Sequence, residues 1–412
     1  MLPPALRCFA VVLGLPICLA ACSDDDHGAG GSGGESASTA APATGSSTTA
    51  SSASSSNGSS SSSASGTSAS GSTSAGSGGG GGDQLCNGEQ CHADQICEPS
   101  GCTFPCTGAS VPGDYATLEA AVQALAGIPG SVICLAAQDY AEPGFVIYGD
   151  DLTIVGPSAS ETTISLMPSA PVRKNVTFRG VTFTTPMRAS GALNVSVDVH
   201  AIGVRFEAGI DLDRGGSGSG ASDVAVTVDG CDIRGGVFAL DGSTGLQGDY
   251  FFTAMNSWFH DTPDDACVRA SLSNSSAALT FDLRNNTIVG CETGVDVYRS
   301  SISGGNAVTL SLFNNIIANH TALGISIDVS GDEIVSTGNN ALFGNANNYA
   351  GAAVDGPGYV KMDCLLDDAA APPSLGAGSP CLDAADAAQA PTNDYWGAPR
   401  SATPDIGAVE VP

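Results

Sequence analysis

The fold is decided by five copies of one short phrase: Gly230-Cys231-Asp232-Ile233, Asn256-Ser257-Trp258-Phe259, Asn286-Thr287-Ile288-Val289, Asn315-Ile316-Ile317-Ala318 and Asn340-Ala341-Leu342-Phe343. The copies begin 26, 30, 29 and 25 residues apart, by subtraction of their first residue numbers. Gly203-Val204-Arg205-Phe206 is a weaker, earlier copy. Internal repeats with a period of roughly 20–50 residues are typical of solenoid proteins.

The residues on either side of each phrase alternate between apolar and polar. Val224-Ala225-Val226-Thr227-Val228 precedes one copy, and Gly324-Ile325-Ser326-Ile327-Asp328 follows another. Alternation of this kind predicts strands, and the intervening Gly and Asn predict turns. Two or three strands in each turn of the chain indicate a parallel β-helix with coils about 4.8 Å apart. Asn256, Asn286 and Asn315 should then stack as a ladder of amides. A β-sandwich would give no reason for this regular return of Asn.

The chain is strongly acidic, with 13 Lys and Arg against 42 Asp and Glu and a formal net charge of −29. Nucleic acid binding depends on basic patches that displace counterions. The composition therefore argues against a nucleic acid partner, and the charge favours solubility of an exposed surface.

Residues 1–21 have the pattern of an export signal. Arg7 precedes an apolar run from Phe9 to Ala21 that is too short to predict a membrane span. The run ends in Leu19-Ala20-Ala21-Cys22, which resembles a bacterial lipoprotein signal. The resemblance implies cleavage before Cys22 and lipidation of that residue, so that acyl chains hold the protein to a membrane. We therefore expect an exported, lipid-anchored protein at the outer membrane or cell surface. The alternative is an ordinary secretory signal with a chance Cys.

Residues 22–82 follow as a tether that is nearly all Ser, Gly, Ala and Thr. Such a composition cannot form a core, so we expect disorder and a reach of about 40 Å.

A Cys-rich segment spans residues 83–111. An exported chain with clustered thiols predicts disulfides, and the spacings lack the CxxC pairs of zinc sites. The residues expected to form disulfides are Cys86, Cys91, Cys97, Cys102, Cys106, Cys134, Cys364 and Cys381. Cys364 and Cys381 should pair with each other, whereas the pairing of the other six stays open. Cys231, Cys267 and Cys291 leave an odd count, which predicts one buried thiol. The segment either staples the tether to the first coil, which its small size favours, or binds a ligand.

Residues 112–412 resemble a known fold family. Leu118, Ala121, Val122 and Leu125 share one helical face, and Val132-Ile133-Cys134-Leu135 and Leu152-Thr153-Ile154-Val155-Gly156 follow as strands. This order resembles the start of the pectin lyase-like superfamily of right-handed parallel β-helices. The resemblance implies an all-β, single-stranded right-handed parallel β-helix (a solenoid) with an N-terminal capping helix, preceded by the disordered tether and the Cys-rich segment.

The closing segment, residues 376–412, is similar to the end of choice-of-anchor Q β-helix proteins. The similar residues are Gly378-Ser379-Pro380-Cys381 and Pro404-Asp405-Ile406-Gly407-Ala408. Asp383, Arg400, Asp405 and Glu410 are expected to fix this segment to the last coil.

Parity along the strands predicts which side chains face solvent. If Ile210, Val295 and Ile325 point inward, their neighbours point outward. One outward column should hold Asp211, Cys267, Asp296 and Ser326, and the next should hold Asp213, Arg269, Tyr298 and Asp328, with Arg299 beside it. With Asp265, the acidic, basic and aromatic members of these columns are our candidates for carbohydrate binding or catalysis. No metal ligand set is defined, although paired Asp residues make Ca²⁺ possible.

The sequence supports three alternative functions. The favoured one is a surface lipoprotein that binds carbohydrate or mediates cell-surface contact, with polysaccharide as its soluble partner. The enzymatic alternative is a polysaccharide lyase that uses Arg269 or Arg299 with Ca²⁺ for β-elimination. Asp264-Asp265 could serve a hydrolase, but it has the composition of a turn. His260 and His320 are expected as solvated or capping groups. The third alternative is a purely structural protein.

Overall fold

The computed structural model describes residues 85–86, 89–99, 101–142, 145–166, 171–191, 194–213, 222–241, 248–272, 277–299, 308–329 and 333–412. The expected signal, the lipidation site Cys22 and the tether lie outside the described residues. Within the described residues, no helix has the length and hydropathy needed to cross a membrane.

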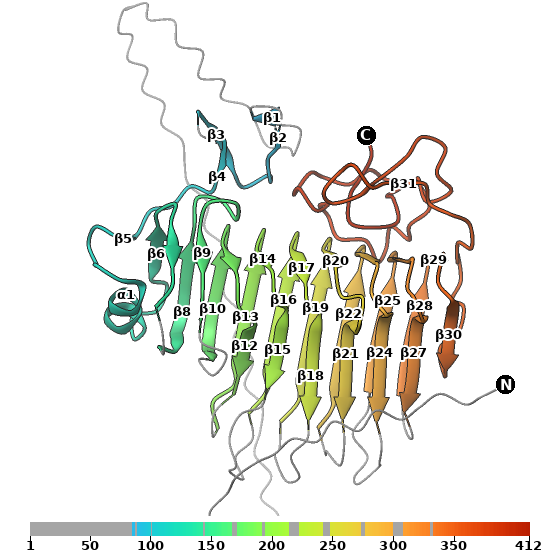
Figure 1. Cartoon of the computed structure of the whole chain (residues 1–412), viewed down its shortest axis with the longest axis horizontal. Helices are drawn as coiled ribbons and strands as arrows, with labels where there is room; N and C mark the ends of the chain where they lie inside the picture. Colours follow the sequence, from blue (N-terminus) through green and yellow to red (C-terminus); the bar gives the residue numbers. More distant parts are fainter. Residues whose placement is uncertain are drawn as a thin grey trace, which may run out of the picture. The chain divides into compact units, whose positions relative to one another are not determined.

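A right-handed parallel β-helix fills most of the described chain, which confirms the predicted fold class (Figure 1). Each central coil contributes one strand to each of three sheets. Sheet 1 contains β5 (Ala109–Val111), β6 (Val132–Leu135), β8 (Ile147–Val155), β10 (Val172–Arg179), β13 (Val197–Ile202), β16 (Val224–Asp229), β19 (Tyr250–Met255), β22 (Leu279–Arg284), β25 (Val308–Phe313) and β28 (Glu333–Gly338).

Sheet 2 is made of short strands that follow a sharp corner. It contains β7 (Asp139–Tyr140), β9 (Thr163–Ile164), β11 (Thr182–Phe183), β14 (Arg205–Phe206), β17 (Asp232–Arg234), β20 (Trp258–His260), β23 (Thr287–Val289), β26 (Ile316–Ala318) and β29 (Ala341–Phe343). Sheet 3 contains β12 (Met187–Ser190), β15 (Ile210–Asp213), β18 (Val237–Asp241), β21 (Ala266–Leu272), β24 (Thr293–Arg299), β27 (Leu323–Val329) and β30 (Asn347–Gly351).

The expected capping helix is α1 (Leu118–Leu125), at the N-terminal end of the stack (Figure 1). The Thr117 hydroxyl accepts a hydrogen bond from the Ala120 amide, at 3.1 Å, which caps the first turn. Leu118, Ala121 and Val122, on one face of this helix, are buried. The helix therefore covers the apolar end of the first coils and protects their edge.

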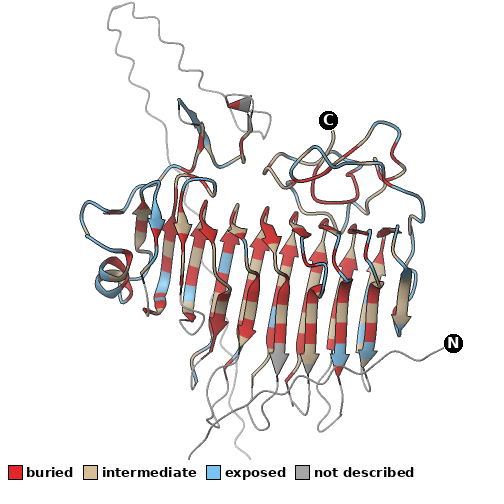
Figure 2. Ribbon diagram, viewed as in Figure 1, coloured by how far each residue is buried: buried red, intermediate tan, exposed pale blue. Residues whose placement is uncertain are grey.

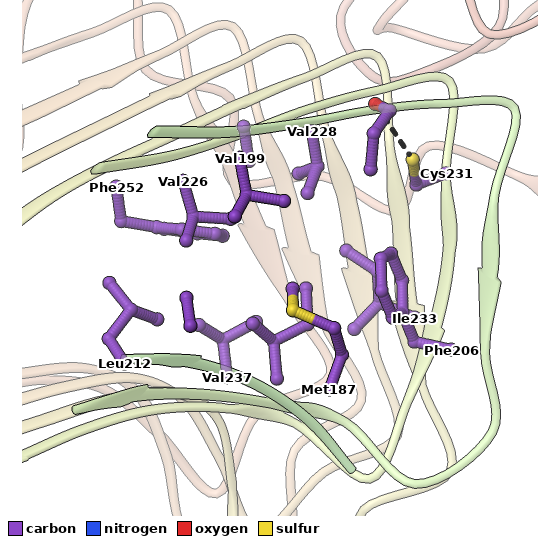
Figure 3. Packing of buried hydrophobic residues seen from close by; sticks show 14 of the residues in the cluster. Met187, Val199, Phe206, Leu212, Val226, Val228, Cys231, Ile233, Val237 and Phe252 are labelled. Atoms are coloured by element: carbon purple, nitrogen blue, oxygen red, sulfur yellow. Dashed lines mark hydrogen bonds between the residues drawn. The ribbon is translucent and has the colours of Figure 1, made fainter. Parts of the chain in front are cut away.

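The core consists of inward side chains that repeat from coil to coil, so buried and half-buried residues alternate along the strands (Figure 2). Val199, Val226 and Phe252 follow one another on sheet 1, opposite Leu212 and Val237 of sheet 3 (Figure 3). Each such side chain adds about 1.5–3 kcal/mol by leaving water.

Cys231 is the buried thiol that the odd cysteine count predicts, and its Sγ lies 3.3 Å from the Ala201 carbonyl oxygen (Figure 3). Burial raises the pKa of this thiol to about 12, so Cys231 packs as a small apolar residue.

The corner between sheets 1 and 2 carries two ladders instead of the single one expected. Trp258 pairs with Thr287, so Asn256 lies level with Asn285 and Ser257 with Asn286. The prediction that Asn256 aligns with Asn286 and Asn315 was therefore wrong by one residue. Two consecutive Asn residues occupy this corner in the later coils, and the repeat alone cannot say which of them continues the column from Asn256.

The inner ladder carries the hydrogen bonds. The backbone N and Nδ2 of Asn286 both donate to Oδ1 of Asn315, each at 3.0 Å. Asn315 repeats this geometry with Oδ1 of Asn340, at 2.9 and 3.0 Å. Each amide also donates to a carbonyl oxygen, which for Asn315 is that of Leu283, at 2.8 Å. The ladder thus satisfies buried backbone groups where the chain turns and sheet pairing stops.

The outer ladder supplies the backbone geometry of the corner. Asn256, Asn285, Asn314 and Asn339 have φ between 50° and 60°, the left-handed region. Asn tolerates this region better than most residues other than glycine.

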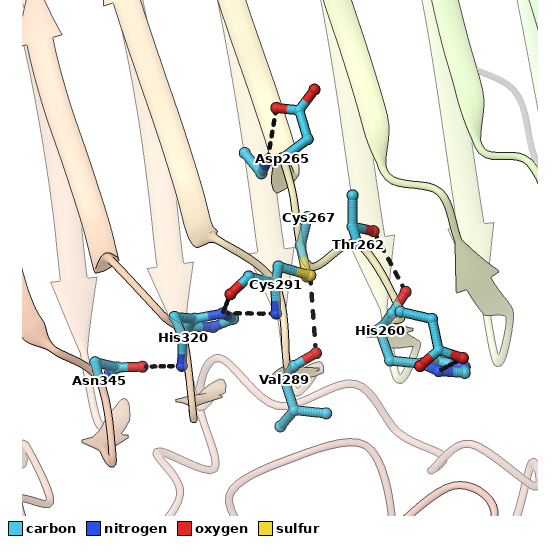
Figure 4. Close-up of a disulfide and its surroundings, with 10 residues drawn as sticks. His260, Thr262, Asp265, Cys267, Val289, Cys291, His320 and Asn345 are labelled. Atoms are coloured by element: carbon cyan, nitrogen blue, oxygen red, sulfur yellow. Dashed lines mark hydrogen bonds and ion pairs between the residues drawn. A yellow bond between two sulfur atoms is a disulfide. The ribbon is translucent and has the colours of Figure 1, made fainter. Parts of the chain in front are cut away.

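At the corner between sheets 2 and 3, a covalent bond joins successive coils. A disulfide links Cys267 to Cys291, a pair that the sequence left unassigned (Figure 4). The Cys291 amide donates to Nδ1 of His320 at 3.2 Å, and the His320 amide donates to Oδ1 of Asn345 at 3.0 Å. Of the two roles expected for His320, solvated or capping, the structure shows the capping one, because its side chain replaces an Asn in this ladder and the residue is 2% exposed.

The closing segment returns along the outer ladder instead of binding only the last coil. Asn285, Asn314 and Asn339 donate through Nδ2 to the carbonyl oxygens of Asp405, Asp386 and Ala384, at 2.9, 3.1 and 3.0 Å. Arg400 donates to Oδ1 of Asn256 at 2.9 Å and pairs with Glu410 at 3.1 Å. The closing segment therefore binds four coils. Arg400 and Glu410 help to fix it, as expected, but not to the last coil alone. The structure forms the Cys364–Cys381 disulfide.

We predict that Asn315→Ala lowers the free energy of unfolding by about 2–4 kcal/mol, because it leaves the buried amides of Asn286 and the Leu283 carbonyl without partners. Urea denaturation measures this loss. Ser311→Ala, a change on the outward face of β25, should alter stability by less than about 0.5 kcal/mol. Equal stability of the two variants would contradict a stabilising ladder.

We predict that His320 makes the fold less stable in mild acid. Burial lowers the pKa of His320 from 6.5 to about 4. The unfolded chain therefore takes up this proton before the folded chain does, and stability falls between about pH 6.5 and pH 4 by up to about 1.4 kcal/mol per unit. His320→Asn should remove this part of the decline in urea midpoints, because Asn fits the ladder. The exposed-site variant His200→Asn should keep the part of the decline that His320 causes. Identical pH profiles for His320→Asn and the parent protein would refute the role of His320 in this decline.

Candidate functional site

The candidate residues of sheet 3 lie on its outward face, but in different columns from those expected. Asp211, Phe238, Arg269, Asp296 and Ser326 are successive partners. The placement of Arg269 in the column of Asp213 was therefore wrong, because parity gives the face of a strand but not its register. Tyr298 and Asp328 are partners of each other, and Tyr298 is 42% exposed.

Two of the expected outward residues are buried. Cys267 lies at the start of β21 and is enclosed by its disulfide. Arg299 is 6% exposed because it continues the inward parity of Val295 and Val297. Asp264 lies in a turn, as expected.

Ion pairs join several of the remaining charges of this face. Arg269 pairs through Nη1 with Asp265 and through Nε with Asp296, the latter at 3.1 Å. Arg188 pairs with Asp213. Burial raises the pKa of Asp211, and the nearby Arg188 partly offsets this effect.

This arrangement suits neither the lyase base nor a Ca²⁺ site. The base of a β-elimination must be free to take a proton from the substrate, whereas the Arg269 guanidinium is already engaged by Asp265 and Asp296. Ca²⁺ takes six to eight oxygen ligands, but guanidinium groups already pair with Asp213, Asp265 and Asp296. Among the described residues, the two groupings of three potential metal ligands both contain disulfide sulfurs.

A different cluster forms around Asp232 on sheet 2, whose side chain is 6% exposed. Arg205 Nε and Arg234 Nη2 lie 2.9 and 3.3 Å from its Oδ2. His260 Nε2 lies 2.7 Å from its Oδ1, while Nδ1 of the same ring lies 2.9 Å from Asp261. His260 is therefore buried and engaged at both nitrogens by carboxylates, so it is neither the solvated nor the capping group that the sequence predicts.

The cations around Asp232 keep it ionised. Burial alone would raise the pKa of Asp232, but the hydrogen bond to His260 and the charges of His260, Arg234 and Arg205 hold this pKa below its usual value. The carboxylate in turn orients the two guanidinium groups, which remain about one-third exposed.

A cavity of about 200 Å³, which we call the Asp232 pocket, lies beside this cluster. The chain has two Trp residues, and both Trp258 and Trp396 line the pocket. The Trp258 ring stacks on His260 with centroids 3.5 Å apart and planes 12° apart, so one of its faces is covered. Glu161 and Phe104 also line the cavity.

The Cys-rich segment forms another wall of this pocket through Gln90, His92 and Gln95. It folds as β1 (Leu85–Cys86), β2 (Glu89–Gln90), β3 (Ile96–Glu98) and β4 (Gly101–Thr103). Its disulfides are Cys86–Cys97, Cys91–Cys102 and Cys106–Cys134, the last of which reaches β6. The segment therefore staples the first coils and also contributes to the cavity.

Noncovalent contacts hold this wall in place. Asp94 pairs with Arg179 at 3.2 Å, and the Phe104 amide donates to the Pro157 carbonyl at 2.8 Å. The Ala93 amide donates to the Trp396 carbonyl, at 2.6 Å, which joins the Cys-rich and closing segments. Burial lowers the pKa of His92, which favours a neutral ring facing the pocket.

The sequence analysis did not identify the Asp232 pocket, although a signal was present. Strand pairing places Asp232 and Trp258 in one column of sheet 2, which continues as Thr287, Ile316 and Ala341 in later coils. Charged and aromatic departures from a repeat mark positions with a special role. Their connection to the Cys-rich and closing segments required the folded structure.

Comparisons with known proteins locate similar structures only. No family model matches the chain, and no curated protein matches it. A pectate lyase, Pel9A, has 13% sequence identity and a TM-score of 0.43, over 74% of this chain and 95% of its own. The A-module of mannuronan C-5 epimerase AlgE4 from Azotobacter vinelandii has 16% identity and a TM-score of 0.34, over 62% of this chain and 73% of its own.

Proposed function

We propose that this protein is a lipid-anchored, surface-displayed lipoprotein that binds carbohydrate in the Asp232 pocket. The observation that carries the binding proposal is the convergence of both Trp residues with the Arg205–Asp232–Arg234 cluster. Aromatic faces pack against the apolar faces of sugar rings, and fixed polar groups give such sites their specificity. The pocket combines both chemistries.

The charge balance of the pocket supports a polar, oxygen-rich ligand. Arg205 and Arg234 present N–H donors on a chain that has only 13 Lys and Arg residues. Because Asp232 fixes these guanidinium groups, a ligand need not order them on binding, which lowers the entropic cost of recognition. Gln90, Gln95 and Glu161 add donors and acceptors suited to hydroxyl groups.

The proposed anchor is Cys22, whose position after Leu19-Ala20-Ala21 supports lipidation. Residues 22–82 would then hold the binding domain away from the membrane, where a polymeric glycan is accessible.

We predict that Cys22→Ser converts the protein from a membrane-bound to a soluble exported form, because acyl chains can no longer be attached. Fractionation of expressing cells, with metabolic labelling by a palmitate analogue, measures both effects. Tether variant Ser23→Ala should remain labelled and membrane-bound. Labelling that persists in Cys22→Ser would refute the anchor.

We predict that the soluble Cys22→Ser protein is retained on an array carrying pectate, alginate, glycosaminoglycans, glucans and chitin oligomers. Arg234→Ala and Trp258→Leu should each weaken the retained interaction by about tenfold or more, because each removes a polar or aromatic contact. Arg269→Ala, on sheet 3, is the matched control and should bind like the parent protein.

The same proteins separate binding from catalysis. Incubation with pectate, alginate and glycosaminoglycans plus Ca²⁺ should give no unsaturated product absorbance. Unsaturated product that the Cys22→Ser protein forms, and that its Arg269→Ala variant does not, would favour the lyase alternative. Retention on none of the glycans would refute the binding proposal and favour a structural role.

A further inference from the structure

A second cavity adjoins the Asp232 pocket along the solenoid axis. It has a volume of about 230 Å³ and is lined by Trp258, Val289, Leu366, Asp368 and Pro373, among others. Trp258 belongs to both cavities. The sheet 2 residues of the Asp232 pocket end at Trp258, whereas the second cavity extends to Val289 in the next coil. Adjacent coils are about 4.8 Å apart, so the two cavities are direct neighbours.

One hairpin borders both cavities. It consists of β31 (Leu366–Asp367) and β32 (Ser374–Leu375), which pair in antiparallel fashion. Ala371 of its connecting loop lines the Asp232 pocket, while Asp368 and Pro373 line the second cavity. The cavities therefore share an inner wall, Trp258, and an outer wall, the hairpin.

Trp258 also carries an unused donor. Its Nε1 is buried and has no hydrogen-bond partner among the described residues. A buried indole N–H usually has an acceptor.

We propose that the two cavities are adjacent subsites of one groove, and that the ligand is a glycan of at least two sugar units that crosses Trp258 beneath the hairpin. This inference rests on the proposed function. Each cavity alone is smaller than the roughly 300–1,000 Å³ of pockets that enclose a whole ligand, but together they fall within that range. Each cavity thus suits one sugar unit.

The test uses the soluble full-length Cys22→Ser protein and its intrinsic fluorescence, because both Trp residues line the Asp232 pocket. The probes are galacturonic acid with digalacturonate, glucose with cellobiose, and N-acetylglucosamine with chitobiose. In at least one pair, we expect the disaccharide to bind at least about tenfold more tightly than its monosaccharide.

Asp368→Ala isolates the second subsite, because this exposed side chain lines only that cavity. It should weaken disaccharide binding by about three- to tenfold and leave monosaccharide binding unchanged. Asp264→Ala, an exposed carboxylate outside both cavities, is the matched control and should change neither affinity.

The outcomes separate this inference from the proposed function. Equal affinities within every pair that binds, or equal effects of Asp368→Ala on both members of a pair, would overturn the two-subsite groove and leave single-site sugar binding intact. A lack of fluorescence change and of calorimetric heat with all six sugars would overturn both proposals.

Discussion

Hydrogen bonding parallel to the solenoid axis is the constraint on which the rest of this structure depends. A coil has no backbone partner of its own, so the coils above and below must satisfy its N–H and C=O groups. Sheet pairing achieves this along the strands, and side-chain amides achieve it at the corner, where Asn286, Asn315 and Asn340 continue the pattern. The resulting register places Arg205, Asp232 and His260, which are distant in sequence, in adjacent coils.

The sequence was sufficient to predict the fold but not the candidate site. Alternation and repeats identify a solenoid because both are local patterns. Register is not local: Asn256 aligns with Asn285, and Arg269 with Asp296, through pairing between coils. The Asp232 pocket is even harder to predict than the register, because Gln90, Trp258 and Trp396 come from three separate parts of the chain. No spacing rule connects them.

The outer corner column explains why the sequence changes from Gly to Asn along the solenoid. Gly180 and Gly203 face Phe104, and a Cβ added at these positions would lie 2.4 and 2.9 Å from its ring. At Gly230, an added Cβ would lie 2.6 Å from the Tyr395 carbonyl oxygen. In later coils, the closing segment accepts hydrogen bonds from Asn side chains at this corner. Gly thus occurs where Phe104 or Tyr395 leaves no room for a Cβ, and Asn occurs where the side chain bonds to the closing segment.

The Cys-rich wall of the Asp232 pocket also determines how the domain carries mechanical load. A pull applied from the N-terminal side reaches Cys86 first, and the disulfides Cys86–Cys97 and Cys91–Cys102 stop the segment from unravelling. The force next strains the noncovalent contacts of the wall, such as Asp94 with Arg179. Beyond them, the Cys106–Cys134 bond passes the force into sheet 1. A pull from this side would therefore open the pocket before it separated a coil from the stack, so the shape of the pocket depends on tension through the order in which these links fail.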